Sequence, residues 1–343
     1  MDFDRYDTVI DCRSPAEFAE DHVPGAISAP VLQDDERAAV GTLYKQHSAF
    51  EAKKLGASLV AKNVARHVET LFAGKQRGWR PLVYCWRGGK RSGAMAHILR
   101  EIGWDARTLE GGYRSYRRWV VAQLETLPEK LDFRVIHGPT GSGKSRLLGA
   151  LRNAGAQALD LEELAAHRGS VLGNLPGRPQ PTQKWFESQL LAALASFDRA
   201  RPVFVEGESK KIGQLQVPEA LIARMRAARC LRLDTALEVR VTLLLDEYRH
   251  FLADRPLLEA QLDCLVGLHG REEIAAWKAL AAQGAWRDFV ARLLMQHYDP
   301  AYRRSSLRNF VQLPQAEIVR IASAEQAAFA AVADQILNVR VAA

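Results

Sequence analysis

The sequence predicts an α/β protein with two domains. At about 150 residues per domain, its 343 residues correspond to two or three folding units, and we expect two, each with its own core. Short apolar, strand-like runs alternate with stretches of helical periodicity in both halves. Two of these runs lead through glycine-rich loops into helices. Such alternation favours parallel sheets that are covered by helices.

The first half contains two strand candidates, at residues 8–10 and 82–84. A long region of helical periodicity, roughly residues 34–73, separates them. Helices are expected at residues 92–102 and 113–127. The second helix ends at a proline, and a new strand begins a few residues later, so we place the domain boundary there. The predicted domains are residues 1–128 and 129–343.

The second half repeats a strand-then-helix pattern four times. The third helix should start near residue 236 and end near Arg255-Pro256, because proline disfavours helix in the residue before it. The last helix is predicted to start with a capping box between Ser323 and Gln326. The predicted strands are residues 134–137, 202–205, 230–233 and 318–321, and the predicted helices follow from residues 144, 218, 236 and 323.

The composition is that of a soluble globular protein and excludes disordered and collagen-like chains, with 48% hydrophobic and 25% charged residues. The longest apolar runs fall far short of the roughly 18 residues of a spanning helix. The acidic N-terminus lacks a secretory signal, and four scattered cysteines form no disulfide scaffold or CxxC metal site. We therefore expect a cytoplasmic protein without a membrane partner. The net charge of +7 permits a nucleic-acid partner but does not require one.

Residues 138–145, Gly-Pro-Thr-Gly-Ser-Gly-Lys-Ser, match the complete phosphate-binding P-loop pattern. The predicted strand before them and the helix after them are the context that this motif needs. Its glycines let backbone N–H groups surround phosphate oxygens at a helix N-terminus. Lys144 should contact the terminal phosphate, and Ser145 is a candidate Mg²⁺ ligand. The predicted phosphate-binding residues are Gly138, Gly141, Gly143, Lys144 and Ser145, and the motif leaves ATP, GTP and a non-nucleotide diphosphate open as ligands.

Acidic residues at strand ends are the candidate partners of a bound Mg²⁺. Glu206 ends an apolar strand, with Glu208 two residues further on. Asp160, which ends a shorter apolar run, is a third candidate. A glutamate that only caps a loop explains each position about as well, so no metal site is firmly predicted.

Cys85 ends an apolar strand and is followed by two glycines and a helix. A thiol over inward-facing amides, beside Arg87, Lys90 and Arg91, should have a lowered pKa and act as a nucleophile. We therefore predict Cys85, Arg87 and Arg91 as catalytic residues. Cys12 and the two remaining cysteines are interpreted as structural. The spacing from Cys85 to Arg91 and Ser92 also fits a cysteine-dependent phosphatase.

Flanking segments favour a sulfurtransferase over a phosphatase. Residues 11–18, Asp-Cys-Arg-Ser-Pro-Ala-Glu-Phe, and residues 22–26 resemble the N-terminal signature of rhodanese domains. Residues 109–113, followed by Trp119, resemble their C-terminal signature. The resemblance implies a rhodanese-like α/β domain in which Asp11 and Arg13 organise the loop. Residues of about 31–79 form a longer and more helical insertion than a minimal module has.

A rhodanese-like domain followed by a P-loop domain resembles the tRNA 2-selenouridine synthase family along the whole chain. Supporting stretches include residues 36–45, 85–92, 138–145, 160–170 and 297–302. The resemblance implies a cytoplasmic transferase that replaces sulfur with selenium in the wobble 2-thiouridine of tRNA, through an S-geranylated intermediate. It implies geranyl diphosphate and selenophosphate as substrates, no tightly bound cofactor, and the anticodon stem-loop as partner. Cys85 would then handle selenium, either by carrying a perselenide or by holding the anion.

Two arginine groups beside aromatic residues are candidate tRNA contacts, because cations follow phosphates and aromatic rings stack on bases. They are Arg114, Arg117 and Arg118 in one group, and Arg303, Arg304 and Arg308 in the other. Two other functions remain open. One is a rhodanese-type sulfurtransferase fused to an ATP- or GTP-dependent P-loop module, and the other is a nucleotide-gated RNA-binding protein with an inert Cys85.

Overall fold

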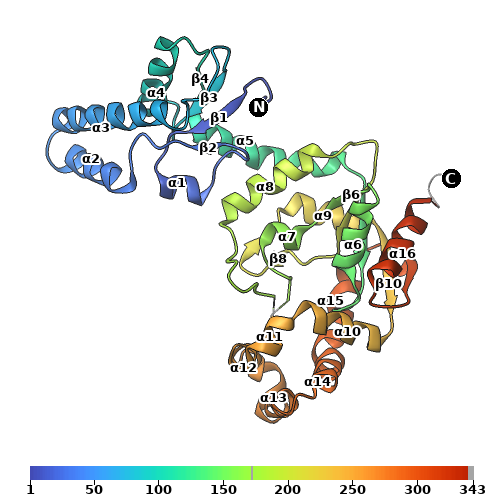
Figure 1. Ribbon diagram of the computed structural model, residues 1–343. Coiled ribbons are helices and arrows are strands. Elements are labelled where there is room, and N and C mark those ends of the chain that lie inside the picture. The colour runs from blue at the N-terminus through green and yellow to red at the C-terminus, as the bar shows by residue number, and fades with distance from the viewer. Residues whose placement is uncertain (171–172, 339–343) are drawn as a thin grey trace. The chain divides into compact units, whose positions relative to one another are not determined.

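The computed structural model describes residues 1–170 and 173–338, and the chain forms two compact units (Figure 1). Unit 1 consists of Met1–Leu124 together with Thr182–Ala192. Unit 2 consists of Glu125–Pro181 and Ala193–Ala343. Helix α8 (Gln183–Ser196) therefore contributes its first turns to unit 1. The N-terminal unit thus includes a segment that lies more than 50 residues beyond its last strand.

Unit 1 is built on a four-stranded parallel sheet in the order β2-β1-β3-β4. The two central strands, β1 and β3, pair in a register that sets Asp11 opposite Tyr84. The residues that follow these strands, Cys12 and Cys85, are therefore neighbours at the same edge of the sheet. The strands are β1 (Thr8–Asp11), β2 (Ile27–Ser28), β3 (Pro81–Tyr84) and β4 (Arg107–Thr108).

Helices cover this sheet, and two of them form the predicted helical insertion. The helical region breaks at His47-Ser48, where the Ser48 side chain caps the next helix by accepting a hydrogen bond from the Glu51 N–H. Buried aromatic and aliphatic side chains around Phe72, Trp79 and Met95 form the core. The helices are α1 (Pro15–Glu20), α2 (Asp34–Gln46), α3 (Ala49–Glu69), α4 (Lys90–Glu101) and α5 (Gly112–Thr126).

Unit 2 contains a five-stranded parallel sheet in the order β11-β10-β5-β7-β6. Its inner strands β5 and β7 are mostly apolar and almost wholly buried, as expected where helices cover a parallel sheet. The central strand β5 leads into the P-loop, so the P-loop lies at the carboxyl edge between β10 and β7. The strands are β5 (Phe133–His137), β6 (Gln157–Leu159), β7 (Val203–Glu206), β10 (Arg229–Thr235) and β11 (Glu317–Ile321).

The helices of unit 2 form two sets. The first accompanies the sheet and contains α6 (Lys144–Asn153), α7 (Leu161–Ala165), α9 (Glu219–Ala227), α10 (Leu237–Glu247) and α16 (Gln326–Asn338). The second set follows α10 and has its own apolar core around Trp277. It contains α11 (Arg249–Ala253), α12 (Arg255–Asp263), α13 (Val266–Ala282), α14 (Trp286–Leu293), the π-helical η2 (Leu294–Tyr298) and α15 (Asp299–Asn309).

Short elements complete unit 2. They are a hairpin of β8 (Lys211–Ile212) and β9 (Leu215–Gln216) and two 3₁₀ turns, η1 (Pro128–Lys130) and η3 (Leu313–Gln315).

Two predicted helix limits in unit 2 were wrong. The helix that was expected to reach Arg255-Pro256 ends at Glu247, and Pro256 lies in the first turn of α12. Proline is tolerated there, and the Asp254 side chain caps the turn by accepting from the Leu257 N–H. Helix α16 starts at Gln326, so Gln326 is not the third helical residue that a capping box requires. Ser323 Oγ accepts instead from the Glu325 N–H, 3.3 Å away.

Candidate active sites

The P-loop of unit 2 adopts a conformation that only its glycines permit. Gly141 and Gly143 have φ angles of +75° and +89°, in the left-handed region. A Cβ on Gly141 would lie 2.8 Å from Leu244, and one on Gly143 would lie 2.6 Å from the Phe329 ring. Lys144 Nζ donates to the Gly138 carbonyl across the loop at 3.3 Å. The predicted phosphate-binding residues therefore form one turn at the N-terminus of α6, where N–H groups favour an anion.

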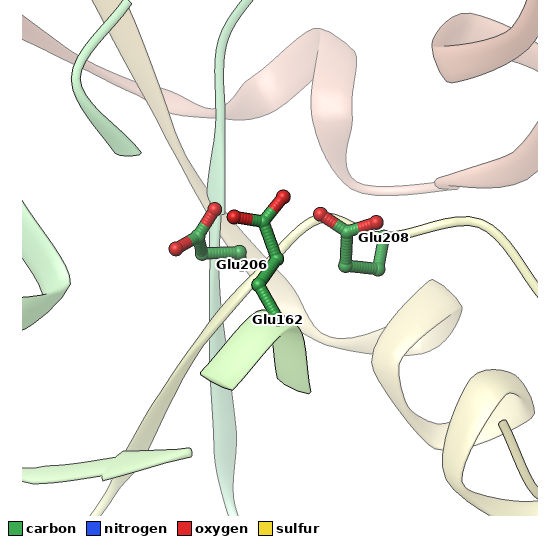
Figure 2. A group of neighbouring side chains, drawn as sticks. All are labelled: Glu162, Glu206 and Glu208. Atoms are coloured by element: carbon green, nitrogen blue, oxygen red, sulfur yellow. The ribbon is translucent and has the colours of Figure 1, made fainter. Parts of the chain in front are cut away.

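Three glutamates gather in one group, as Figure 2 shows, and they line the same pocket as the P-loop. Glu206 ends β7, Glu208 follows it by two residues, and Glu162 lies in the first turn of α7 after β6. Because β6 and β7 are neighbouring parallel strands, their carboxyl ends meet at one edge of the sheet. One carboxylate oxygen from each glutamate lies within 4.8 Å of the others. We call Glu162, Glu206 and Glu208 the glutamate cluster.

The glutamate cluster differs from the predicted acidic set by one residue. Asp160 caps α7 by accepting from the Glu163 N–H at 2.9 Å and also lies 3.4 Å from Arg152, so it serves the helix and is not among the three. Glu162 takes its place. The sequence did contain a signal for Glu162. This glutamate lies in the first turn of the helix that follows β6, and β6 ends at the same edge of the sheet as β7.

The electrostatics of the cluster favour a bound cation. Burial, and then repulsion between the carboxylates, raises the pKa of all three glutamates above the ordinary range, while Lys144 opposes the rise. Glu206 is only 2% exposed, and both of its carboxylate oxygens lack a well-formed hydrogen bond among the described residues. The Ser145 hydroxyl lies close enough to offset part of the shift. Clustered carboxylate oxygens and a hydroxyl are the ligands that Mg²⁺ prefers, so the residues fit this ion.

The P-loop and the cluster line one pocket with about 1360 Å³ of space, part of it open to solvent. Arg168 contributes a cation and lies 5.5 Å from the Tyr248 ring centroid. The remaining wall comes from α10, η2 and α15, including Leu244, Glu247, His297, Tyr298 and Tyr302. The pocket therefore combines an anion-binding loop, a cation site and an aromatic wall.

The cysteine loop of unit 1 stabilises a thiolate. Cys85 Sγ accepts from the Gly89 N–H at 3.3 Å and from Ser92 Oγ at 3.3 Å. The Cys12 thiol also donates to it, and this bond contributes most to the shift. Together these donors outweigh the opposing effect of burial and lower the pKa of Cys85 to about 4. Cys85 is thus a thiolate at neutral pH.

Cys12 is a neighbour of Cys85 that the sequence did not reveal. We interpreted it as a structural cysteine, and it is fully buried. Its backbone N–H extends the β1–β3 ladder by donating to the Tyr84 carbonyl at 2.9 Å, which places its side chain beside Cys85. Burial, followed by the hydrogen bond to Cys85, raises the pKa of the Cys12 thiol. Cys12 therefore stays a neutral thiol, and its S–H group donates a hydrogen bond to the Cys85 thiolate.

The two predicted catalytic arginines have different surroundings. Arg91 lies near Cys85 and forms an ion pair with Glu17 at 2.9 Å. Although burial opposes it, this pair lowers the pKa of Glu17. Arg87 is exposed at the loop surface and forms no hydrogen bond or ion pair with any described residue. Only Arg87 therefore has a guanidinium that is unpaired and available to an incoming anion.

Segments far apart in the sequence support the cysteine loop. Gly112, at φ +57°, lies so close that a Cβ there would be 2.2 Å from the Cys85 carbonyl oxygen. The Tyr113 N–H donates to that oxygen at 2.8 Å. Asp11 and Arg13 form a buried ion pair at 2.6 Å, and the Arg13 guanidinium stacks 3.9 Å from the Tyr113 ring centroid. The pair contacts the loop's supports but not Cys85, in agreement with a structural role.

Comparisons with known proteins match both units. The family model described as Rhodanese-like domain matches residues 1–118, and the one described as tRNA 2-selenouridine synthase AAA domain matches residues 131–261. The tRNA 2-selenouridine synthase of Shewanella loihica is 34% identical over an alignment of 324 residues, and the alignment covers 86% of each chain. That of Alcanivorax borkumensis is 33% identical and covers 86% of this chain and 88% of the relative. The chain belongs to the tRNA 2-selenouridine synthase family.

Family membership confirms the predicted order of a rhodanese-like α/β domain followed by a P-loop α/β domain. The alignment with the Nitrosomonas europaea tRNA 2-selenouridine synthase is 36% identical over 257 residues and covers 66% of that relative, slightly less than two thirds. Within residues 1–170 and 173–338, no helix has both the length and the apolar character needed to cross a bilayer.

The structure places the predicted tRNA-contacting arginines of this synthase-family chain on two helices. On α5, Arg114 and Arg118 are exposed, whereas Arg117 is paired with Glu187 of α8. On α15, Arg303 and Arg304 are exposed. The side chain of Arg308 lies outside the described residues. The exposed members remain candidates for phosphate contacts.

Proposed function

We propose that this chain is a transferase that converts the wobble 2-thiouridine of tRNA into 2-selenouridine through an S-geranylated intermediate. One observation carries the proposal: a single chain holds both a thiolate-stabilising cysteine loop and a P-loop beside a carboxylate cluster. The names of its relatives support tRNA as the substrate, and tRNA modification agrees with the cytoplasmic location expected from the sequence. The P-loop pocket and the cysteine loop then serve successive half-reactions.

The first half-reaction is assigned to the P-loop pocket. The 2-thio sulfur bonds to C1 of geranyl diphosphate, the C1–O bond breaks, and its electron pair leaves with pyrophosphate. Backbone N–H groups of the P-loop and Lys144 hold the diphosphate and stabilise the charge that develops on it. The glutamate cluster and Ser145 would hold Mg²⁺, which supplies further neutralisation of the diphosphate. The exposed Arg303 and Arg304 are proposed to hold tRNA phosphates.

The second half-reaction is assigned to the Cys85 loop. Selenium from selenophosphate displaces geranyl thiol at C2 of the base, and hydrolysis of the P–Se bond leaves 2-selenouridine and phosphate. Alkylation favours this displacement because it turns the sulfur into a better leaving group. Hydrogen-bond donors that stabilise the Cys85 thiolate also suit a selenium anion. Arg87 is available to balance its charge.

Mass spectrometry of nucleosides from treated 2-thiouridine tRNA tests this division of labour. Cys85→Ser should abolish selenium incorporation and leave geranylation largely intact. Lys144→Ala should reduce geranylation roughly a hundredfold, in line with the loss of one charge-stabilising donor. Cys264→Ser and Lys211→Ala change exposed residues outside both sites and are the matched controls.

Equal loss of both activities in both active-site variants would contradict the separate assignments. If tRNA stays unmodified while thiosulfate is turned over and ATP or GTP is hydrolysed, the chain is instead a sulfurtransferase fused to a nucleotide-dependent module.

A further inference from the structure

Two histidines meet at the wall of the P-loop pocket. His269 Nε2 and His297 Nδ1 lie 2.9 Å apart, which is a hydrogen-bond distance. His269 belongs to α13 and His297 to η2, and both lie in unit 2. His297 lines the pocket together with the P-loop glycines and Lys144. One ring of the pair therefore faces the space in which a ligand of the P-loop would react.

The backbone departs from a regular α-helix beside each histidine. Gly270 interrupts α13 directly after His269 with φ +81° and ψ 164°, a conformation that is essentially restricted to glycine. The η2 segment forms a π-turn, in which the Asp299 N–H donates to the Leu294 carbonyl five residues earlier. Such π-turns inside helices are frequent at functional sites. The two departures set the rings of His269 and His297 against each other.

Neighbouring side chains hold both rings in place. The fully buried Trp277 lies 5.0 Å from the His269 ring, measured between ring centroids. Its Nε1–H donates to the Gln296 side chain at 3.0 Å, so α13 contacts two consecutive residues of η2. The Tyr298 ring packs edge-on against His297, with centroids 4.7 Å apart. The His297 ring therefore has a defined orientation at the pocket wall.

The surroundings of His297 favour a neutral imidazole. Burial, and then the neighbouring His269 and Arg304, hold the pKa of His297 below its ordinary range. A hydrogen bond between two imidazole rings needs one N–H donor and one acceptor nitrogen. Elsewhere in the described part of the chain, no group hydrogen-bonds to His297 Nε2. When His297 donates from Nδ1 to His269, its Nε2 keeps a lone pair that accepts a proton.

Other groups of the pocket are less suited to accept a proton. Glu247 lies 3.7 Å from Arg146 and 3.9 Å from Arg168. The glutamate cluster is assigned to Mg²⁺ in the proposed function. Burial raises the pKa of Tyr248 and of Tyr298, so both phenols stay protonated. The remaining charged or phenolic side chains of the pocket are Lys144 and Tyr302.

We propose that His297 is the general base of the alkylation step and that His269 is its positioning residue. The inference rests on the proposed function and deepens it, because S-alkylation of 2-thiouridine releases the proton of the ring nitrogen N3. General acid–base catalysis by a positioned histidine meets such a need. His269 would accept the Nδ1–H hydrogen bond of His297 and keep its Nε2 directed at the base, as the third member of a catalytic triad does.

The bonds and the proton of this step balance. The N3–H proton passes to His297 Nε2, and the N3–H electron pair forms the N3=C2 double bond. The electron pair of the C2=S bond moves to the sulfur, which bonds to C1 of geranyl diphosphate while the C1–O pair leaves with pyrophosphate. Loss of the N3 proton raises the electron density on the sulfur and makes it a stronger nucleophile. The imidazolium then returns its proton to water, since part of the pocket is open to solvent.

Single-turnover geranylation of 2-thiouridine tRNA by the full chain, measured from about pH 6 to about pH 9, tests the proposal. His297→Gln should lower the rate at neutral pH roughly a hundredfold or more. The rate of this variant should recover at alkaline pH, where N3 loses its proton without help, and added imidazole should restore part of it at neutral pH. His97→Gln changes an exposed histidine of unit 1 and should behave as the wild type.

Two substitutions of His269 test the positioning role and keep the test valid if His297→Gln unfolds. His269→Gln retains an acceptor atom near the position of Nε2 and should keep most of the wild-type rate. His269→Leu removes the acceptor and should lower the rate at neutral pH roughly tenfold, the effect of one hydrogen bond. This loss should also disappear at alkaline pH, which a purely structural role would not produce.

Unchanged geranylation by His297→Gln would overturn the inference while the proposed function stands. A loss that neither alkaline pH nor imidazole relieves, in a variant that melts like the wild type, would overturn it as well. Equal rates of the two His269 variants at every pH would exclude the positioning role. If Glu247→Gln shows the alkaline recovery and His297→Gln does not, Glu247 is the base instead. A wild-type chain that forms no geranylated tRNA would overturn the proposed function itself.

Discussion

At the scale of single residues, the reactivity of Cys85 depends on Cys12, and Cys12→Ala should expose this dependence. A hydrogen bond to a charged group stabilises it by about 1.5–3 kcal/mol, so its loss should raise the pKa of Cys85 by about one to two pH units. The thiolate fraction at acidic pH then falls, and alkylation by iodoacetamide slows. The measurement is the pH dependence of the alkylation rate, followed by mass spectrometry of the Cys85 peptide.

The matched control is Cys230→Ala, which removes a buried cysteine from unit 2 and should leave the titration midpoint of Cys85 unchanged. Both variants are made in a Cys264→Ser background, because Cys264 is exposed and would consume the reagent. An unchanged midpoint in Cys12→Ala would show that the thiolate is stabilised by Gly89 and Ser92 alone.

At the scale of elements, the sequence predicted most strands and both glycine-rich loops. It did not predict which side chains the pairing of neighbouring strands would place next to each other. Apolar runs located β1, β3, β5, β7, β10 and β11, and the two loops followed from their local patterns. Cys12 and Glu162 went unrecognised because their roles depend on strand pairing, which local patterns do not encode. The helices from α12 to α15 were not anticipated, since the alternation of strands and helices is interrupted between α10 and β11.

The strand-end glutamate cluster makes folding stability depend on pH, and Glu206→Gln should reduce this dependence. Burial raises the pKa of Glu206 in the folded protein, so the folded state binds protons more tightly than the unfolded chain. Stability is then fully present below the ordinary glutamate pKa and is lost as pH rises through the raised value. Thermal melting at about pH 5 and about pH 9 should show a smaller alkaline loss in the variant than in the wild type.

Magnesium should restore alkaline stability to the wild type, because a cation that binds only the folded state stabilises it. Glu206→Gln should respond less to magnesium. Glu163→Gln is the matched control, since Glu163 lies on α7 next to Glu162 of the cluster but is exposed and paired with Arg178. Identical magnesium responses in wild type and Glu206→Gln would exclude Glu206 as a ligand.

At the scale of the whole molecule, each candidate site is built from one compact unit. All residues that line the P-loop pocket belong to unit 2, and those around Cys85 belong to unit 1. Unit 1 recruits the start of α8, where Trp185 stacks 3.9 Å from His22 and Glu187 pairs with Arg117. Only the folded chain reveals that recruitment, because the segment follows the P-loop strand in the sequence.

Because each site is complete within its own unit, two inactive variants should complement each other in a mixture. Cys85→Ser retains the P-loop pocket and should supply S-geranylated tRNA. Lys144→Ala retains the Cys85 loop and should convert that tRNA to the selenium product. Nucleoside mass spectrometry should therefore detect 2-selenouridine in the mixture, although neither variant alone produces it efficiently.

A mixture no more active than its components would mean that the intermediate passes between sites of one molecule without release, or that both residues serve a single step. A Cys85→Ser, Lys144→Ala double variant mixed with Lys144→Ala separates recovery by complementation from residual activity, because it lacks both functions and should restore nothing.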